Sequence, residues 1–115
     1  MPQPSKPLAG LKVIELGTLI AGPFAARICA EFGAQVTKVE SPDGGDPLRK
    51  WRKLYEGTSL WWFVQARNKR SITLNLKHPQ GREVLMKLLA EADILIENFR
   101  PGVLEKLGFG WDVLH

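Results

Sequence analysis

The pattern of apolar and polar positions over the first third of the chain predicts one strand–helix–strand unit. Residues 13–16 form a short, mostly apolar run that ends at a glycine, as a buried strand often does. A helix is predicted to begin at Pro23, because proline suits the first helical position. Its buried face is expected to carry apolar residues that recur every four positions, namely Phe24, Ile28 and Phe32. Gly33 is placed to end this helix, and residues 35–40 predict a second strand.

Downstream the same kind of pattern continues. A helix capped by Thr58 or Ser59 is predicted to run through Arg67, and its aromatic and aliphatic residues are expected to be core, with an interface as the alternative. Further elements are predicted along the rest of the chain: strands at 71–76 and 93–96, and helices from Pro79, over 101–107 and from Trp111. Alternating strands and helices favour parallel pairs with right-handed crossovers. The sequence therefore predicts an α/β fold, a Rossmann-like parallel sheet with helices on both faces, in a single domain over residues 1–115.

Composition excludes several classes of protein. With 115 residues, 44% of them hydrophobic, the chain is long enough to bury one core. A single cysteine, Cys29, excludes an internal disulfide, no apolar run approaches a membrane span, and residues 1–8 lack the apolar region of a secretory signal. No metal site is expected, because His78 and His115 lie far apart and no acidic cluster has ligand spacing. No nucleic-acid module signature is present. We therefore expect a cytoplasmic protein with neither a nucleic-acid nor a membrane partner.

Charge and loop positions indicate where a ligand would bind. The net charge is +4, with cationic residues concentrated between Arg49 and Arg70, which favours a phosphate-bearing small molecule; a solvated basic surface is the alternative. Ligands of parallel sheets bind beyond the carboxyl ends of the strands. Residues 18–23, 41–47 and 98–102 follow predicted strands and lie at that edge, although any one such turn more often binds nothing. The amide, ring and cation within 98–102 suit a ligand with phosphates and a ring.

Motifs in chain order resemble the N-terminal part of the class III CoA-transferases, the formyl-CoA and carnitine-CoA transferase type. The segments that carry the resemblance cover almost the whole chain: 11–16, 21–24, 31–40, 44–49, 68–76, 79–82 and 93–102. The resemblance implies cytoplasmic enzymes that transfer coenzyme A between carboxylic acids and need no metal. It also implies a larger fold in which two long chains interlock as a homodimer. The partners would be a CoA thioester and a carboxylic acid.

By position, the resemblance implies a set of CoA-binding residues in the first turn after a strand, the Asn-Lys-Arg junction and the Asn-Phe-x-Pro-Gly turn. These residues are Ile20, Ala21, Asn68, Lys69, Asn98, Phe99, Arg100 and Lys106. Two positions depart from some members of the family. Ser41 stands where some members use arginine against adenosine, and Ile20 stands where formyl-CoA members use glutamine. Oxalate–formate exchange is therefore not expected.

No catalytic residue is assigned to this chain. The nucleophile of the family is an aspartate that attacks the acyl-CoA thioester, and the resemblance places it beyond the matched region, so Asp112 is not given that role. The chain is thus interpreted as an N-terminal fragment that is inactive alone. Two other functions stay open at this point: a fragment of an acyl-CoA racemase from the same superfamily, and a stand-alone module that binds a nucleotide or CoA without catalysis.

Overall fold

The computed structural model describes residues 5–115. Residues 1–4, which belong to the predicted domain and to the segment 1–8 discussed above, lie outside the described part. The predicted strand–helix–strand unit is confirmed, with β1 at Lys12–Glu15, α1 at Ala21–Glu31 and β2 at Gln35–Glu40. The helix begins two residues before Pro23, and Gly33 has the positive φ of +107° expected after a helix end. How far the domain extends stays a prediction.

The face of α1 that packs on the sheet differs from the predicted one. Phe24 and Phe32 are 47% and 50% exposed, whereas Ala26 and Ala30 are buried against Val13 and Val36 of the two central strands. Both sets recur every four positions, so periodicity alone does not choose between them. The small alanines allow the helix axis to lie close to the sheet, and the expectation of a buried Phe24–Ile28–Phe32 face is wrong.

The chain from residue 69 onward adds two strands and three helices. Strand β5 covers Lys69–Thr73, helix α3 Pro79–Ala90, strand β6 Ile94–Ile96, and the short helices α4 and α5 Val103–Lys106 and Trp111–Leu114. The strand predicted at 71–76 begins and ends earlier in the structure, because its pairing with β2 decides its limits. Lys69 lies opposite Val36, and Thr73 lies opposite Glu40, the last residue of β2. His78 caps α3, its Nδ1 accepting a hydrogen bond from the amide of Gln80 at 3.1 Å.

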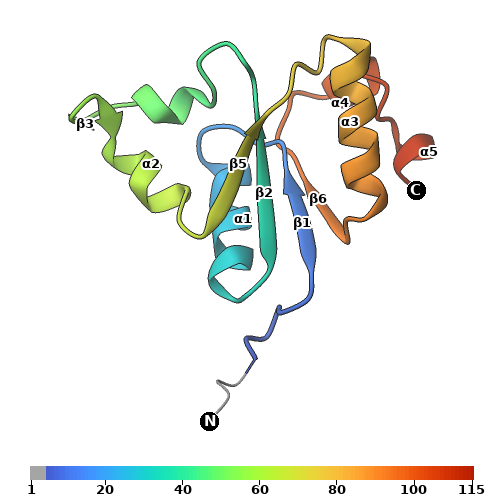
Figure 1. Cartoon of the computed structure of the whole chain (residues 1–115). Helices are drawn as coiled ribbons and strands as arrows, with labels where there is room; N and C mark the ends of the chain where they lie inside the picture. The colour runs from blue at the N-terminus through green and yellow to red at the C-terminus, as the bar shows by residue number, and fades with distance from the viewer. Residues whose placement is uncertain (1–4) are drawn as a thin grey trace.

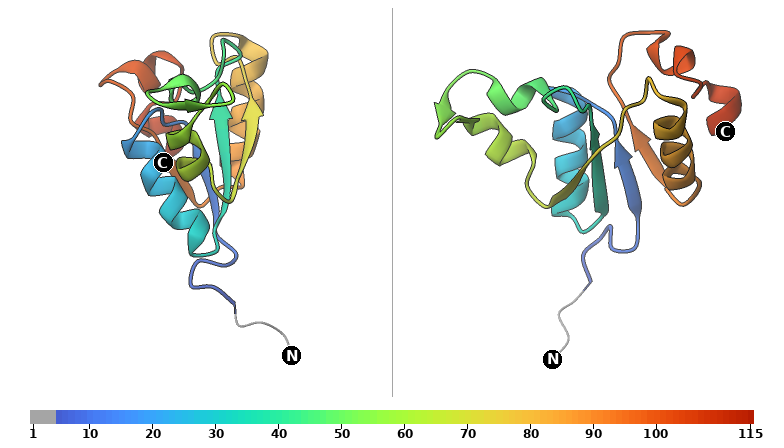
Figure 2. Two further views of the ribbon diagram at one scale, coloured as in Figure 1. Left: turned by 90° about the vertical axis from the view of Figure 1, so that its left-hand side faces the viewer. Right: turned by 45° about the horizontal axis from the view of Figure 1, so that its top comes forward.

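The strands form one four-stranded parallel sheet in the order β5-β2-β1-β6, with α1 and α3 on opposite faces (Figures 1 and 2). Neighbouring residues of β1 contribute to both cores, since Val13 packs under α1 and Ile14 packs with Leu85 of α3. The Rossmann-like sheet with helices on both faces is therefore confirmed. Within residues 5–115, no helix is both long enough and apolar enough to cross a membrane.

An excursion between β2 and β5 projects away from the sheet (Figure 1). It consists of the 3₁₀ helix η1 (Pro47–Lys50), the β3–β4 hairpin (Leu54–Tyr55 and Thr58–Ser59) and helix α2 (Leu60–Gln65). The Ser59 cap is confirmed, because its Oγ accepts a hydrogen bond from the Trp61 amide at 3.1 Å. The helix ends two residues before Arg67, and the hairpin was not predicted.

The apolar residues of α2 are not core within this chain, contrary to the favoured prediction. Four of its side chains are between 38% and 53% exposed: Leu60, Trp61, Phe63 and Val64. Trp62 is partly covered by Arg49, whose guanidinium carbon lies 3.8 Å from the centre of the ring. A six-residue helix at the rim of the molecule has too few neighbours to bury such a face, which leaves the alternative of an interface.

Candidate functional site

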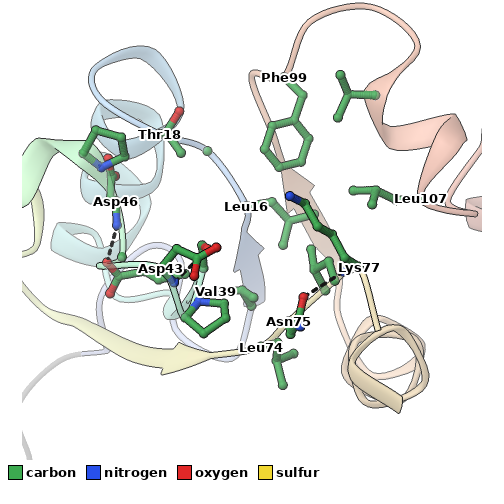
Figure 3. A pocket seen from close by; sticks show the side chains of 18 residues that line it. Leu16, Thr18, Val39, Asp43, Asp46, Leu74, Asn75, Lys77, Phe99 and Leu107 are labelled. Atoms are coloured by element: carbon green, nitrogen blue, oxygen red, sulfur yellow. Dashed lines mark hydrogen bonds between the residues drawn. The ribbon is translucent and has the colours of Figure 1, made fainter. Parts of the chain in front are cut away.

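A pocket lies where the four parallel strands end, at the edge predicted to bind a ligand (Figure 3). Its volume is about 440 Å³, which falls within the usual range for small-molecule sites. Its apolar side chains come from the ends of the strands and from the chain leading into and along α4: Leu16, Val39, Leu74, Leu76, Phe99, Val103 and Leu107. Its polar side chains lie mainly on the connecting loops: Thr18, Ser41, Asp43, Asp46, Asn75 and Lys77.

The pocket offers a flat ligand apolar side chains and one cationic group. Phe99 and Leu107 stand on one side of the space, Leu16, Val39 and Leu74 form its base, and the Lys77 side chain extends among them (Figure 3). Aromatic faces and aliphatic side chains favour a planar ring, and an ammonium favours a phosphate oxygen. This combination suits a nucleotide-like ligand.

Four of the residues predicted to bind CoA lie on the two turns next to this pocket. Phe99 lines it directly. Asn98 is paired with the backbone of the neighbouring turn, its Oδ1 accepting from the Thr18 amide and its Nδ2 donating to the Thr18 carbonyl, both at 2.9 Å. Ile20 directly precedes α1 and is 37% exposed, and Ala21 is the first residue of that helix. The structure thus brings the first βα turn and the turn after β6 together.

The other four predicted residues are distributed differently. Arg100 follows Phe99 and is exposed, and Lys106 is the exposed last residue of α4. Asn68 and Lys69 lie at the start of β5, at the amino end of the parallel sheet, whereas the pocket lies at the carboxyl end. Asn68 is exposed, but the side chain of Lys69 is only 2% exposed. Their CoA-binding roles stay predictions.

Lys69 belongs to a buried group of charges on the α1 side of the sheet. Its ammonium lies 2.6 Å from Glu15 Oε1 and donates to the Pro23 carbonyl at 2.8 Å. Lys38, also buried, lies 2.6 Å from the other oxygen of Glu15 and 2.8 Å from Asp46 Oδ2. Burial lowers the pKa of Lys69, against the opposing attraction of Glu15. Two cations and two carboxylates thus compensate one another out of water.

A third buried carboxylate, Glu40 at the end of β2, holds the loop that follows this strand. Arg49 donates to both of its oxygens, at 2.8 and 2.7 Å, the Asp46 amide donates at 2.8 Å, and the Ser71 hydroxyl donates as well. Burial by itself would raise the pKa of Glu40, but the bonds from Arg49, Asp46 and Ser71 outweigh it and lower the pKa to about 2. Glu40 is therefore ionised throughout the physiological range.

Several lining residues were missed at the level of sequence. Leu74, Asn75, Leu76 and Lys77 were assigned to a strand or left without a role, yet they leave the carboxyl end of β5 and form one wall of the pocket. Their position after a strand was the available signal. Glu97, which follows β6, accepts a hydrogen bond from the Phe99 amide at 2.8 Å.

Comparison with known protein families gives one match to nearly the whole chain. The model of "CoA-transferase family III" matches residues 8–115. A succinyl-CoA–D-citramalate CoA-transferase of Chloroflexus aurantiacus is 50% identical over 114 residues, covering 98% of this chain and 28% of that protein. The beta subunit of a succinyl-CoA–L-malate CoA-transferase of the same organism is 56% identical over 109 residues, covering 94% and 27%. The human succinyl-CoA:glutarate CoA-transferase is 40% identical, covering 93% and 25%.

Solved structures show the same fold. A CAIB/BAIF family protein from Brucella suis superposes with a TM-score of 0.87 at 41% identity, covering 96% of this chain and 30% of that one. The Rv3272 protein of Mycobacterium tuberculosis superposes with a TM-score of 0.88 at 37% identity, covering 97% and 32%. The chain thus spans between a quarter and a third of the relatives it matches. With a family model that covers residues 8–115, the chain belongs to CoA-transferase family III.

Proposed function

We propose that the full-length protein transfers CoA between carboxylic acids, and that the pocket in this chain holds the adenosine end of CoA. The observation that carries the proposal is an apolar pocket of about 440 Å³ at the carboxyl ends of the strands, in a chain of this family. Phe99 provides a face on which adenine stacks, and the ammonium of Lys77 neutralises a phosphate. Arg100 and Lys106, both exposed beyond Phe99, add positive charge for the other phosphates.

The first βα turn supplies the next part of the site in this proposal. Ile20 and Ala21 lie where α1 begins, and the first amides of a helix have no acceptor within it, so they can donate to a phosphate or amide of CoA. Asn68 and Lys69 complete the set implied by the resemblance. A direct contact between the Lys69 ammonium and CoA requires that amine to leave Glu15 and the Pro23 carbonyl.

The proposed donor is succinyl-CoA, because several relatives carry that donor in their names. Ile20, which stands where formyl-CoA members of the family use glutamine, argues against oxalate–formate exchange. The chemical step is assigned to an aspartate outside these 115 residues, which attacks the thioester to form an acyl anhydride and then an aspartyl-CoA thioester. The proposal includes a cytoplasmic homodimer, for which the exposed apolar side chains of α2 provide contact surface.

The test uses the full-length protein. Calorimetry measures CoA binding to the wild type and to the variants Phe99→Ala and Lys77→Ala, each expected to weaken binding about tenfold, the effect of about 1.4 kcal/mol. Lys87→Ala is the matched control. Lys87 is an exposed lysine on α3, and within residues 5–115 its one ion pair is with Glu83, at 3.8 Å. Equal affinity in all four proteins would remove the pocket from the CoA site.

Activity is tested with succinyl-CoA and a panel of dicarboxylic acids, separating the acyl-CoA products by chromatography. The expected result is a new acyl-CoA that appears as succinyl-CoA disappears. A parallel incubation in deuterated water reports the racemase alternative. Incorporation of deuterium at the α-carbon of an acyl-CoA, without CoA exchange, would contradict the proposed transfer.

A further inference from the structure

The turn that leads from β1 into the first two residues of α1, residues 17–22, has a conformation that it does not hold by itself. Leu19 has a φ of +63°, a left-handed conformation that costs energy for a residue with a side chain. The two ends of the turn touch: a Cβ on Gly17 would lie 2.8 Å from the Cα of Gly22, and one on Gly22 would lie 2.9 Å from the Cα of Gly17. Such a strained, tightly closed turn needs support from outside.

Asn98 gives this support from the turn after β6. Its carboxamide makes two hydrogen bonds of 2.9 Å to the amide and the carbonyl of Thr18, as a neighbouring strand would do. The same oxygen would lie 2.9 Å from a Cβ on Gly17, so the glycine makes room for this approach. One donor and one acceptor of Asn98 are thereby engaged within the protein.

Asp46 gives a second support from the loop after β2. Its Oδ1 accepts from the Leu19 amide at 3.0 Å and from the Leu48 amide at 2.9 Å. Its Oδ2 lies 2.8 Å from the buried ammonium of Lys38, which also donates to the Gly17 carbonyl at 3.0 Å. Because Asp46 is 3% exposed, its position is fixed by these bonds. Two adjacent peptide units of the strained turn are thus held by side chains from two different loops.

We infer that Asn98 and Asp46 are positioning residues, which hold the turn 17–22 in the shape that presents Ile20 and Ala21 to CoA. Asn98 acts through the backbone of Thr18, not through a contact of its carboxamide with CoA. The inference rests on the proposed function, since it assigns a role to residues around the same site. It makes two separable statements: the turn is held in the absence of ligand, and its shape contributes to affinity.

The experiment compares Asn98→Ala, Asn98→Asp and Asp93→Ala in the full-length protein. Asp93→Ala is the matched control, because Asp93 Oδ2 accepts from the Lys12 amide at 2.9 Å and so links the same two parts of the chain at the other end of the sheet. Hydrogen exchange of peptides covering residues 17–24 is measured without CoA, and calorimetry measures the CoA affinity. Asn98→Asp keeps the acceptor but loses the donor, and tests the inference if the alanine variant does not fold.

The expected result is faster exchange of residues 17–24 in both Asn98 variants before CoA is added, together with CoA binding weakened about tenfold, as the loss of one good hydrogen bond produces. The control should exchange normally there and bind CoA within a factor of about two of the wild type. Weaker binding with unchanged exchange in the free protein would overturn the inference in favour of a direct contact. Faster exchange with unchanged affinity would overturn it as well. A wild type that does not bind CoA would instead refute the proposed function.

Discussion

Glu40 provides the sharpest test of how the buried charges support the fold. The perturbation is Glu40→Gln, which keeps the shape of the side chain but removes its charge. In the wild type both carboxylate oxygens are occupied, by Arg49 at 2.8 and 2.7 Å, the Asp46 amide at 2.8 Å and the Ser71 hydroxyl. Glutamine turns one acceptor into a donor that faces the guanidinium. The substitution should therefore destabilise the loop that carries Asp46.

The magnitude follows from the pKa of Glu40, which falls from 4.5 to about 2 in the folded protein. Each pKa unit corresponds to about 1.4 kcal/mol, so ionised Glu40 stabilises the folded state by about 3 kcal/mol at neutral pH. The folded pKa is depressed, so this contribution is complete above the unfolded pKa and is lost as the pH falls towards 2. Linkage leaves about 1.4 kcal/mol of it at pH 3.

The assay is denaturant unfolding followed by tryptophan fluorescence, for wild type and variant, between pH 3 and pH 8. The difference in unfolding free energy should be constant from about pH 6 upwards and fall by about half at pH 3. Glu56→Gln serves as the control, because Glu56 is an exposed carboxylate in the β3–β4 turn and its loss should change stability by less than about 0.5 kcal/mol. A difference of the same size at pH 3 and pH 7 would refute the reasoning.

Three further predictions concern single residues. Arg100→Ala should weaken CoA binding by about 1.5–3 kcal/mol if its guanidinium contacts a phosphate, which calorimetry measures. Lys69→Met should lower the unfolding free energy by about 3 kcal/mol, because it leaves Glu15 Oε1 without its ammonium at 2.6 Å while Lys38 still faces the other oxygen. Gly81→Ala should cost at least about 3 kcal/mol in a denaturant titration, because an added Cβ would lie 2.0 Å from the Asn75 carbonyl oxygen.

Each of these has an outcome that contradicts it. Unchanged CoA affinity in the Arg100 variant would show that this residue does not belong to the site. Arg52→Ala controls for the loss of one positive charge, because Arg52 is an exposed arginine stacked on Trp51. A Lys69 variant as stable as the wild type would mean that its buried ion pair contributes no net stability. Gly110→Ala is the control for Gly81, because a Cβ there meets nothing closer than 3.7 Å, and equal costs for both glycines would refute the steric argument.

The sequence predicted the sheet because each of its strands has a clear local signal. β1 and β2 are short apolar or alternating runs with a glycine at a helix end between them, and this is enough to place a ligand edge beyond Glu15 and Glu40. The limits of β5 could not be predicted from its own sequence, because they depend on where β2, its partner strand, ends. The buried face of α1 was predicted wrongly, because the exposed phenylalanines and the buried alanines both recur every four residues.

The exposure of the apolar residues of α2 was not predicted, for a different reason. A helical repeat of large side chains indicates that a surface is to be buried, but not which partner covers it. In this chain Trp61 and Phe63 stay 43% and 53% exposed, and Trp62 is partly covered by Arg49. The relatives that this chain matches are three to four times its length.

The buried charges were the least predictable part of the site, and they connect its parts. Lys38 and Glu40 lie on a strand whose polar positions resemble a solvated face, and their burial depends on Glu15, Asp46 and Arg49 arriving from elsewhere. Burying charge is costly, and pairing returns that cost only when the geometry is right. Here the paired groups join the end of β1 and the loop after β2, both next to the pocket, to the start of β5 at the opposite end of the sheet. Because each of these buried charges is stable only when it is paired, the group holds the end of β1 and the loop after β2 together before any ligand binds.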